Sequence, residues 1–272
     1  MDETVFYLMR PGDPDVPDHL WKPGLWGHTV GLVNIYSKIQ DLQKDLAEAA
    51  EWDEESMEDR VRRLHAEYVA FEESLGPQVR YSRENLAAYV ARGLGRVFVS
   101  FHLGFFHYGT LLFYQYLDHR RPSTRNGRAY ADRCKYHAMM VCDILRASRE
   151  QEGAEALYNI VGHVTVVSSS VLLHTYLFGG TDELPEAKWR LESNLESLKQ
   201  LRSYYPSVEL MVSEDSRTAA LRIKADMHQD QPASNFPEQL LEIREGNIQV
   251  RSMDDQIPHP ACFSIGREGW RH

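Results

Sequence analysis

The stretch that decides the fold is YSRENLAAYVARGLGRVFVSFHLGFFHYGTLLFYQYLD, residues 81–118. Its part from 97 to 117 carries no formal charge. A helix of that length could cross a membrane or form the buried centre of a soluble helical domain. A second uncharged stretch, IVGHVTVVSSSVLLHTYLFGG, covers residues 160–180. The choice between membrane spans and core helices therefore governs the interpretation of the whole chain.

Polar residues inside both stretches favour core helices. The first stretch contains His102, His107 and Gln115, and the second contains His163 and His174. Polar groups at membrane depth are costly unless they have partners. The neighbouring segments have one apolar face each, and amphipathic helices of this kind need a core to cover. We therefore predict a protein without a membrane partner, in which both stretches are central buried helices.

Apolar residues recur at steps of three and four along most of the chain, which predicts further helices. Ser82 is suited to cap the helix that follows it, and Gly93-Leu94-Gly95-Arg96 predicts a kink or a close helix contact rather than a nucleotide-binding loop. The expected helices cover residues 32–49, 57–75, 82–89, 97–117, 128–151, 160–180 and 187–205, with a weaker one over 207–227.

The predicted fold class is all-α, a single helical domain of about seven to eight helices with two central buried helices and an irregular C-terminal tail. Four prolines make residues 1–26 an irregular N-terminal segment. Residues 27–227 are expected to form the helical domain. Residues 228–272 are expected to be a poorly ordered tail with a small hairpin over 241–250, because an isolated hairpin is only marginally stable.

Composition excludes several classes of protein. The formal net charge of −10 disfavours binding to nucleic-acid phosphates. The three cysteines, Cys134, Cys142 and Cys262, form no CxxC pair, which fits a reducing compartment and excludes the usual cysteine-based zinc sites. The acidic N-terminus lacks the cationic and apolar regions of a secretory signal.

Twelve histidines raise the question of a metal or acid–base site. His163 and His174 share a helical face but lie about 16 Å apart along the axis, too far to share one ion. His102 and His107 point roughly 140° apart on a helix. The chain has no HExxH motif, nucleophile elbow or P-loop. We therefore expect core histidines bonded to neighbouring backbone or hydroxyl groups, with no catalytic residue, metal or cofactor.

Five pieces of the chain carry a family resemblance in their order and spacing, over about residues 20–213. They are LWGHTVGLVNIYSKIQDL at 25–42, the stretch at 81–118, YADRCKYHAMMVCDIL at 130–145, GHVTVVSSSVLLHTYLFGG at 162–180, and the helix at 190–205 followed by PSVELM at 206–211. Together they resemble the regulatory ("fungal-specific transcription factor") domain of fungal zinc-cluster transcription factors.

Two departures from that family shape the expected function. Its members usually carry a six-cysteine zinc cluster near the N-terminus, with basic residues that read DNA. This chain has no cysteine in its first 130 residues and no basic N-terminal stretch, which argues against direct DNA binding. From Glu214 onward the sequence also departs from the family pattern.

The resemblance implies a nuclear, non-enzymatic regulator of transcription that is reduced to its regulatory domain and controls a metabolic gene cluster. Such a protein would act through protein partners, either full-length zinc-cluster factors or other transcriptional proteins, or through a small effector. An alternative hypothesis is a small helical enzyme or ligand-binding protein of fungal metabolism, located in the cytoplasm. A nonfunctional truncated regulator is a third.

An effector would be bound by polar side chains of the two central helices. Histidine and tyrosine suit this role because each combines an apolar ring with a hydrogen-bonding group. The candidate effector-binding residues are His102, His107, Tyr108, His163 and His174.

Overall fold

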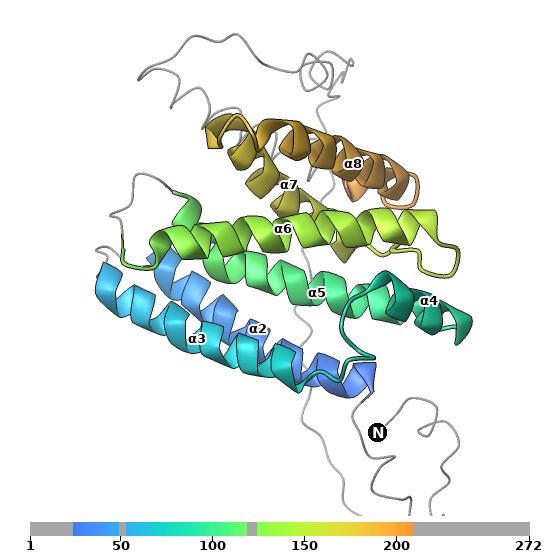
Figure 1. Cartoon of the computed structure of the whole chain (residues 1–272), viewed down its shortest axis with the longest axis horizontal. Coiled ribbons are helices and arrows are strands. Elements are labelled where there is room, and N and C mark those ends of the chain that lie inside the picture. The colour runs from blue at the N-terminus through green and yellow to red at the C-terminus, as the bar shows by residue number, and fades with distance from the viewer. Residues whose placement is uncertain (1–23, 49–52, 119–123, 209–272) are drawn as a thin grey trace, which may run out of the picture. The chain divides into compact units, whose positions relative to one another are not determined.

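The computed structural model describes residues 24–48, 53–118 and 124–208. Within these residues the chain forms seven α-helices and no strand, so the all-α prediction is confirmed there (Figure 1). The elements are α2 (Leu25–Glu48), α3 (Glu54–Ser74), α4 (Arg83–Ala91), α5 (Gly95–Phe113), the 3-10 helix η2 (Tyr114–Leu117), α6 (Gly127–Glu150), α7 (Ile160–Phe178) and α8 (Leu184–Arg202).

Helix α5 lies at the centre of the bundle (Figure 1). Helices α2 and α3 pack against it from one side, and α6 packs along it from the other. Helix α7 contacts α5, α6 and α8, and α8 also contacts α6, so these two helices extend the bundle beyond α6. The uncharged stretch at 97–117 therefore forms most of α5, and α5 contacts more of the other helices than any other element does.

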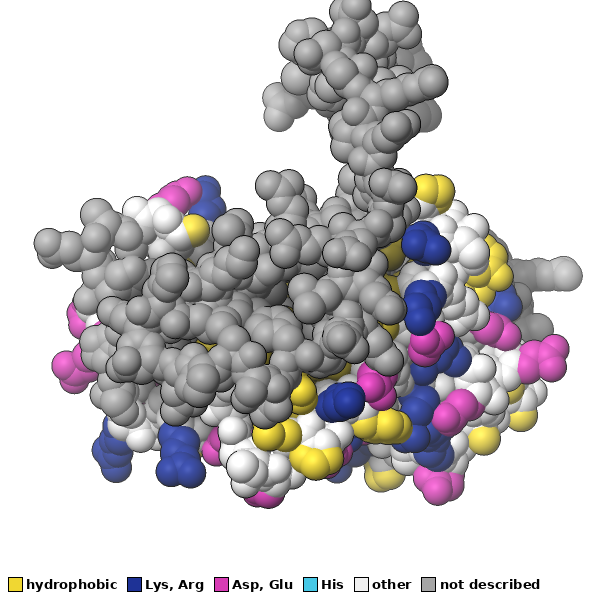
Figure 2. Space-filling view, turned by 90° about the horizontal axis from the view of Figure 1, so that it is seen from above, with side chains coloured by type: hydrophobic (Ala, Val, Ile, Leu, Met, Phe, Trp, Pro, Cys, Tyr) yellow, Lys and Arg dark blue, Asp and Glu magenta, His cyan; other side chains and the backbone are white. Residues whose placement is uncertain are grey.

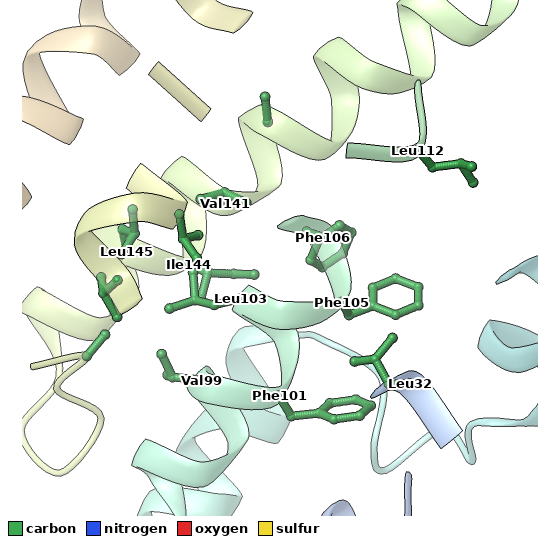
Figure 3. Close-up of a cluster of buried hydrophobic side chains, with 14 of the residues drawn as sticks. Leu32, Val99, Phe101, Leu103, Phe105, Phe106, Leu112, Val141, Ile144 and Leu145 are labelled. Atoms are coloured by element: carbon green, nitrogen blue, oxygen red, sulfur yellow. The ribbon is translucent and has the colours of Figure 1, made fainter. Parts of the chain in front are cut away.

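Apolar side chains leave α5 in more than one direction, which explains why this helix can do without charges (Figure 3). Val99 and Leu103 point toward Ile144 of α6, whereas Phe105 points toward Leu32 of α2. All five side chains are buried. Burial of a side chain of this size stabilises the fold by about 1.5–3 kcal/mol. The core is thus centred on α5 and continuous on both of its sides.

Local sequence signals account for several helix ends. The hydroxyl of Ser82 accepts a hydrogen bond from the backbone N–H of Asn85 at 3.0 Å, which confirms the predicted cap of α4. Between α4 and α5 the chain turns at Gly93, whose φ of 73° is a left-handed conformation that glycine adopts without strain. The predicted kink at this glycine is confirmed.

Several helix boundaries differ from the prediction by one to three residues, and two further differences have an identifiable cause. Helix α2 begins at Leu25, so the last two residues of the segment predicted to be irregular, 1–26, are helical; Leu25 is fully buried and continues the same apolar stripe. The helix predicted over 97–117 keeps its α-helical form only to Phe113 and then tightens into η2. A tighter last turn of this kind is common at helix ends.

Helices α5 and α7 are both long and apolar enough to cross a membrane by length and composition alone, when η2 is counted with α5. In the domain, 67% of the α5–η2 window and 50% of the α7 window are buried. Helix α5 therefore behaves as a core helix. Helix α7 is less enclosed and leaves Ile160 and Phe178 exposed at its two ends.

The side of the domain on which α8 lies has a mixed-charge surface, where basic and acidic side chains are interspersed (Figure 2). Such a mixture of charges is typical of the solvated face of a helix. The exposed charged residues of α8 are Glu186, Lys188, Glu192, Glu196, Lys199 and Arg202.

Several predictions fall on residues outside the described ranges. These are most of the irregular segment over 1–26, nearly all of the weak helix over 207–227, the hairpin over 241–250 and the tail over 228–272. The proposed domain limits therefore stay predictions.

Candidate functional site

Four aromatic rings from three helices meet beside the middle of α5 and form what we call the ring cluster: Tyr36 of α2, His107 and Tyr108 of α5, and His163 of α7. Tyr36 and Tyr108 stack, with centroids 4.1 Å apart and planes 14° from parallel. His107 and His163 meet edge to face, with centroids 5.4 Å apart. Three of the five predicted effector-binding residues therefore lie together.

Neighbouring hydrogen bonds hold the α2 side of the cluster in place. Gln40, one turn after Tyr36, donates to the Tyr36 hydroxyl. One turn further, the side-chain amide of Gln43 donates to the backbone carbonyl of Leu111 at 2.7 Å, which ties α2 to α5. These two contacts fix the position of the Tyr36 ring over Tyr108.

The two residues that α5 contributes to the ring cluster are polar and uncharged at pH 7. Burial, and next the neighbouring His163, lower the pKa of His107 to about 4, so this imidazole is neutral at pH 7. Burial, and next Tyr36, raise the pKa of Tyr108, which keeps its phenol protonated. His163 is exposed, whereas His107 is buried with no hydrogen-bond partner for its Nδ1 among the described residues.

His102 is separate from the ring cluster. It is buried against Tyr81 and Phe98, and its Nδ1 lies 2.8 Å from the backbone carbonyl of Phe98. Burial lowers its pKa to about 4. His102 is therefore a core histidine bonded to backbone, which is the arrangement that the sequence predicted for such residues.

His174 also lies apart from the cluster. It is three turns beyond His163 on α7, and its ring packs against Phe178, with centroids 5.0 Å apart. The rise of an α-helix, about 1.5 Å per residue, is the reason why these two histidines cannot act on one ligand atom. The five predicted residues are thus distributed over three places.

Sequence reasoning missed His137, the most strongly perturbed histidine of the described residues. It is buried in α6 between aromatic rings of α3 and α5, including Tyr68 and Phe113. Burial, and next Arg133, lower its pKa to about 3. In the sequence, His137 lies at helical spacing between Cys134 and Val141 on one apolar face of α6. That pattern indicates a core position for His137.

The ring cluster offers imidazole and phenol groups for single hydrogen bonds, but its four residues include no carboxylate to act as an acid or base beside the histidines. Among the residues that the structure describes, no group of three or more His, Cys, Asp or Glu side chains could hold a metal ion. No family model, curated protein or solved structure matches the chain. The function is therefore proposed from this chain's own residues and from the resemblance that its sequence carries.

Proposed function

We propose that this protein is a non-enzymatic regulator of transcription of the fungal zinc-cluster regulatory-domain type, which acts in the nucleus through protein partners or a small effector. Direct DNA binding is not part of the proposal, because the chain lacks the basic, six-cysteine element that reads DNA in that family. Full-length zinc-cluster factors and other transcriptional proteins are the proposed partners, and a metabolic gene cluster is the proposed target.

One observation carries the proposal. Three pieces of sequence that resemble the family, 25–42, 81–118 and 162–180, supply all four residues of the ring cluster. Pieces that are far apart in the chain thus contribute to one place in the fold. That is the arrangement expected of a ligand-responsive domain, in which a small molecule contacts several helices at once.

The chemistry of the cluster defines the proposed effector. The neutral imidazole of His107 and the protonated phenol of Tyr108 favour a planar, uncharged molecule that stacks on an aromatic face. A hydrogen-bonding group on that molecule would pair with an imidazole or a phenol of the cluster.

The regulatory role is tested by fusing the whole chain to a heterologous DNA-binding domain and measuring output from a reporter gene. We expect output to change severalfold relative to the DNA-binding domain alone. Tyr108→Leu, which removes the stack with Tyr36, should reduce that change, whereas Tyr204→Leu, at an exposed tyrosine, should not. Unchanged reporter output, together with no partner recovered by affinity purification from fungal nuclei, would contradict the proposal.

Effector binding is tested by thermal unfolding of the purified chain in the presence of planar, uncharged metabolites. A ligand at a hundredfold excess over its dissociation constant stabilises a protein by about 2.7 kcal/mol. His163→Ala should abolish the shift, because His163 is exposed and can be truncated without opening the core. Ile160→Ala, at an exposed residue of the same turn outside the cluster, is the matched control and should retain it.

The two assays also separate the proposal from its alternative. A thermal shift that depends on His163, combined with an inactive reporter fusion, would favour the small ligand-binding protein of fungal metabolism. A reporter change without any ligand shift would favour regulation through protein contacts alone.

A further inference from the structure

Helix α8 lies at the outside of the bundle, where it packs against α6 and α7 (Figure 1). It buries six of its 19 residues, whereas the central helix α5 buries 13 of 19. Three of those six residues are polar, namely Arg190, Asn194 and Ser197, and they follow one another at steps of four and three along one stripe. The face with which α8 covers the bundle is therefore largely polar.

Polar groups join α8 to α6. Arg190 contacts Asp143 at 2.8 Å and donates to the backbone carbonyl of Met139 at 3.0 Å. From the other side, Arg149 donates to the backbone carbonyl of Ser193 at 2.8 Å and to its hydroxyl at 2.9 Å. Water takes over such hydrogen bonds when the two helices separate, so their net contribution is far below their strength in isolation.

The contact between α8 and α7 contains a buried amide that is only partly satisfied. The Nδ2 atom of Asn194 donates to the hydroxyls of Ser168 at 3.1 Å and Ser169 at 3.0 Å, and these hydroxyls donate in turn to the backbone carbonyls of Ala138 and Thr165. Its Oδ1 atom has no hydrogen-bond partner among the described residues. A buried acceptor without a partner destabilises the packed arrangement, and water satisfies it once α8 moves away.

The start of α8 is weakly attached. Residues 179–183, which begin with two glycines, link it to α7, and small residues are common at hinges. No side chain of the described residues forms a capping hydrogen bond at this helix end. The contact there is an ion pair between Lys135 and Glu183 at 3.1 Å. The side chains of this pair are 21% and 40% exposed, and a pair so close to solvent contributes little.

We propose that α8 is a lid, which undocks from α6 and α7 as a unit while the rest of the bundle stays folded. The apolar part of the contact, formed by Ala187, Leu198 and Leu201, holds the lid closed. Opening transfers the polar stripe to water and bares α7, a helix that contains no Asp, Glu, Lys or Arg. This device goes beyond the function proposed for the ring cluster and does not depend on it.

The opening is measured by amide hydrogen exchange of the full chain, read by mass spectrometry. We expect the amides of α8 to share one protection factor, about a hundredfold or more below that of α5, because the lid opens far more often than the whole protein unfolds. Equal protection of α8 and α5 would overturn the proposal. A protection that declines steadily toward one end of α8 would indicate fraying and would overturn it as well.

One substitution in the core separates opening of the lid from unfolding of the protein. Tyr68→Phe removes a hydrogen bond between α3 and α5. It should lower the protection of α5 severalfold and leave that of α8 unchanged, because the lid opens without disturbing this contact. A parallel fall in both helices would show that α8 opens only together with the core.

A second substitution tests the polar stripe itself. Asn194→Leu replaces the partly satisfied amide by an apolar side chain of similar size, and should raise the protection of α8 about tenfold. Ser168 and Ser169 keep their backbone acceptors in this variant. Gln200→Leu, at an exposed residue of the same helix, is the matched control and should leave the protection unchanged. Unchanged or lower protection in Asn194→Leu would contradict the role of the stripe.

Discussion

The imidazole of His137 lies directly against Gly109, so that a Cβ on Gly109 would stand only 2.7 Å from the Cε1 and Nδ1 atoms of the ring. Glycine at this position of α5 therefore allows the close approach of α6. The contact joins the two helices that form the centre of the core. It also explains how a histidine ring can be accommodated there without an opening in the packing.

Gly109→Ala should destabilise the protein by about 1–3 kcal/mol, because the added methyl group overpacks a buried contact. The matched control is Gly104→Ala on the same helix, where the nearest heavy atoms would be 3.9 Å from the new Cβ. That substitution should stabilise by about 0.5–1 kcal/mol through helix propensity. Urea unfolding measures both. Equal effects of the two substitutions would contradict the described contact.

Stability should fall as the pH is lowered below about 6.5. Burial lowers the pKa values of His102, His107 and His137 from 6.5 to about 4, 4 and 3. Below pH 6.5 the unfolded chain therefore takes up protons that the folded chain does not, and this difference is absent at higher pH. The free energy of unfolding should drop by about 1.4 kcal/mol per pH unit for each histidine, down to about pH 4.

Urea unfolding at several values between pH 7.5 and 5 measures this slope. His137→Phe should make it shallower, because one of the three buried histidines is removed while a ring of similar size remains. A free energy of unfolding that stays constant over this pH range would show that these rings are not buried in the neutral form.

The hydroxyl of Tyr68 donates to the backbone carbonyl of Phe105 at 2.6 Å in the core between α3 and α5. Tyr68→Phe should therefore destabilise the protein by about 1 kcal/mol, since the buried carbonyl loses its side-chain partner. Tyr204→Phe, at an exposed tyrosine, should have no measurable effect. Thermal unfolding of the two variants measures both effects. An unchanged unfolding temperature in Tyr68→Phe would contradict the hydrogen bond to Phe105.

The pair formed by Arg190 and Asp143 should contribute more than an exposed ion pair. Arg190 is nearly buried and contacts Asp143 at 2.8 Å, with a further partner in Glu186. Asp143→Asn should cost about 1.5–3 kcal/mol, because the guanidinium loses a charged hydrogen-bond partner inside the α6–α8 contact. Glu196→Gln, which breaks an exposed pair with Lys199, should change stability by less than about 0.5 kcal/mol. Similar effects in both variants would argue against burial of Arg190.

Much of the fold within the described ranges could be predicted from the sequence. The apolar spacing of Leu32, Ile35 and Ile39 predicts α2, and those side chains are buried. The capping role of Ser82 and the turn at Gly93 also follow from local chemistry. These features depend on neighbours a few residues away, so the linear order of residues contains the information.

The candidate sites could be predicted only in part. Helical geometry correctly separates His163 from His174, because both lie on one helix of known rise. Helical geometry does not predict that His107 and His163 meet, because they lie on different helices and come together only where α7 packs beside α5. The stack of Tyr36 on Tyr108 depends in the same way on where α2 lies.

By itself, the sequence determined that this protein is helical, that the uncharged stretches are helices rich in core positions, and that local caps and turns separate them. Only the tertiary structure decided that His102 lies apart from the ring cluster, that Gly109 makes room for the ring of His137, and that Arg149 links α6 to α8 through Ser193 and Ser197. Helical periodicity assigns each side chain to a face, whereas the packing of helices distant in sequence determines what that face meets.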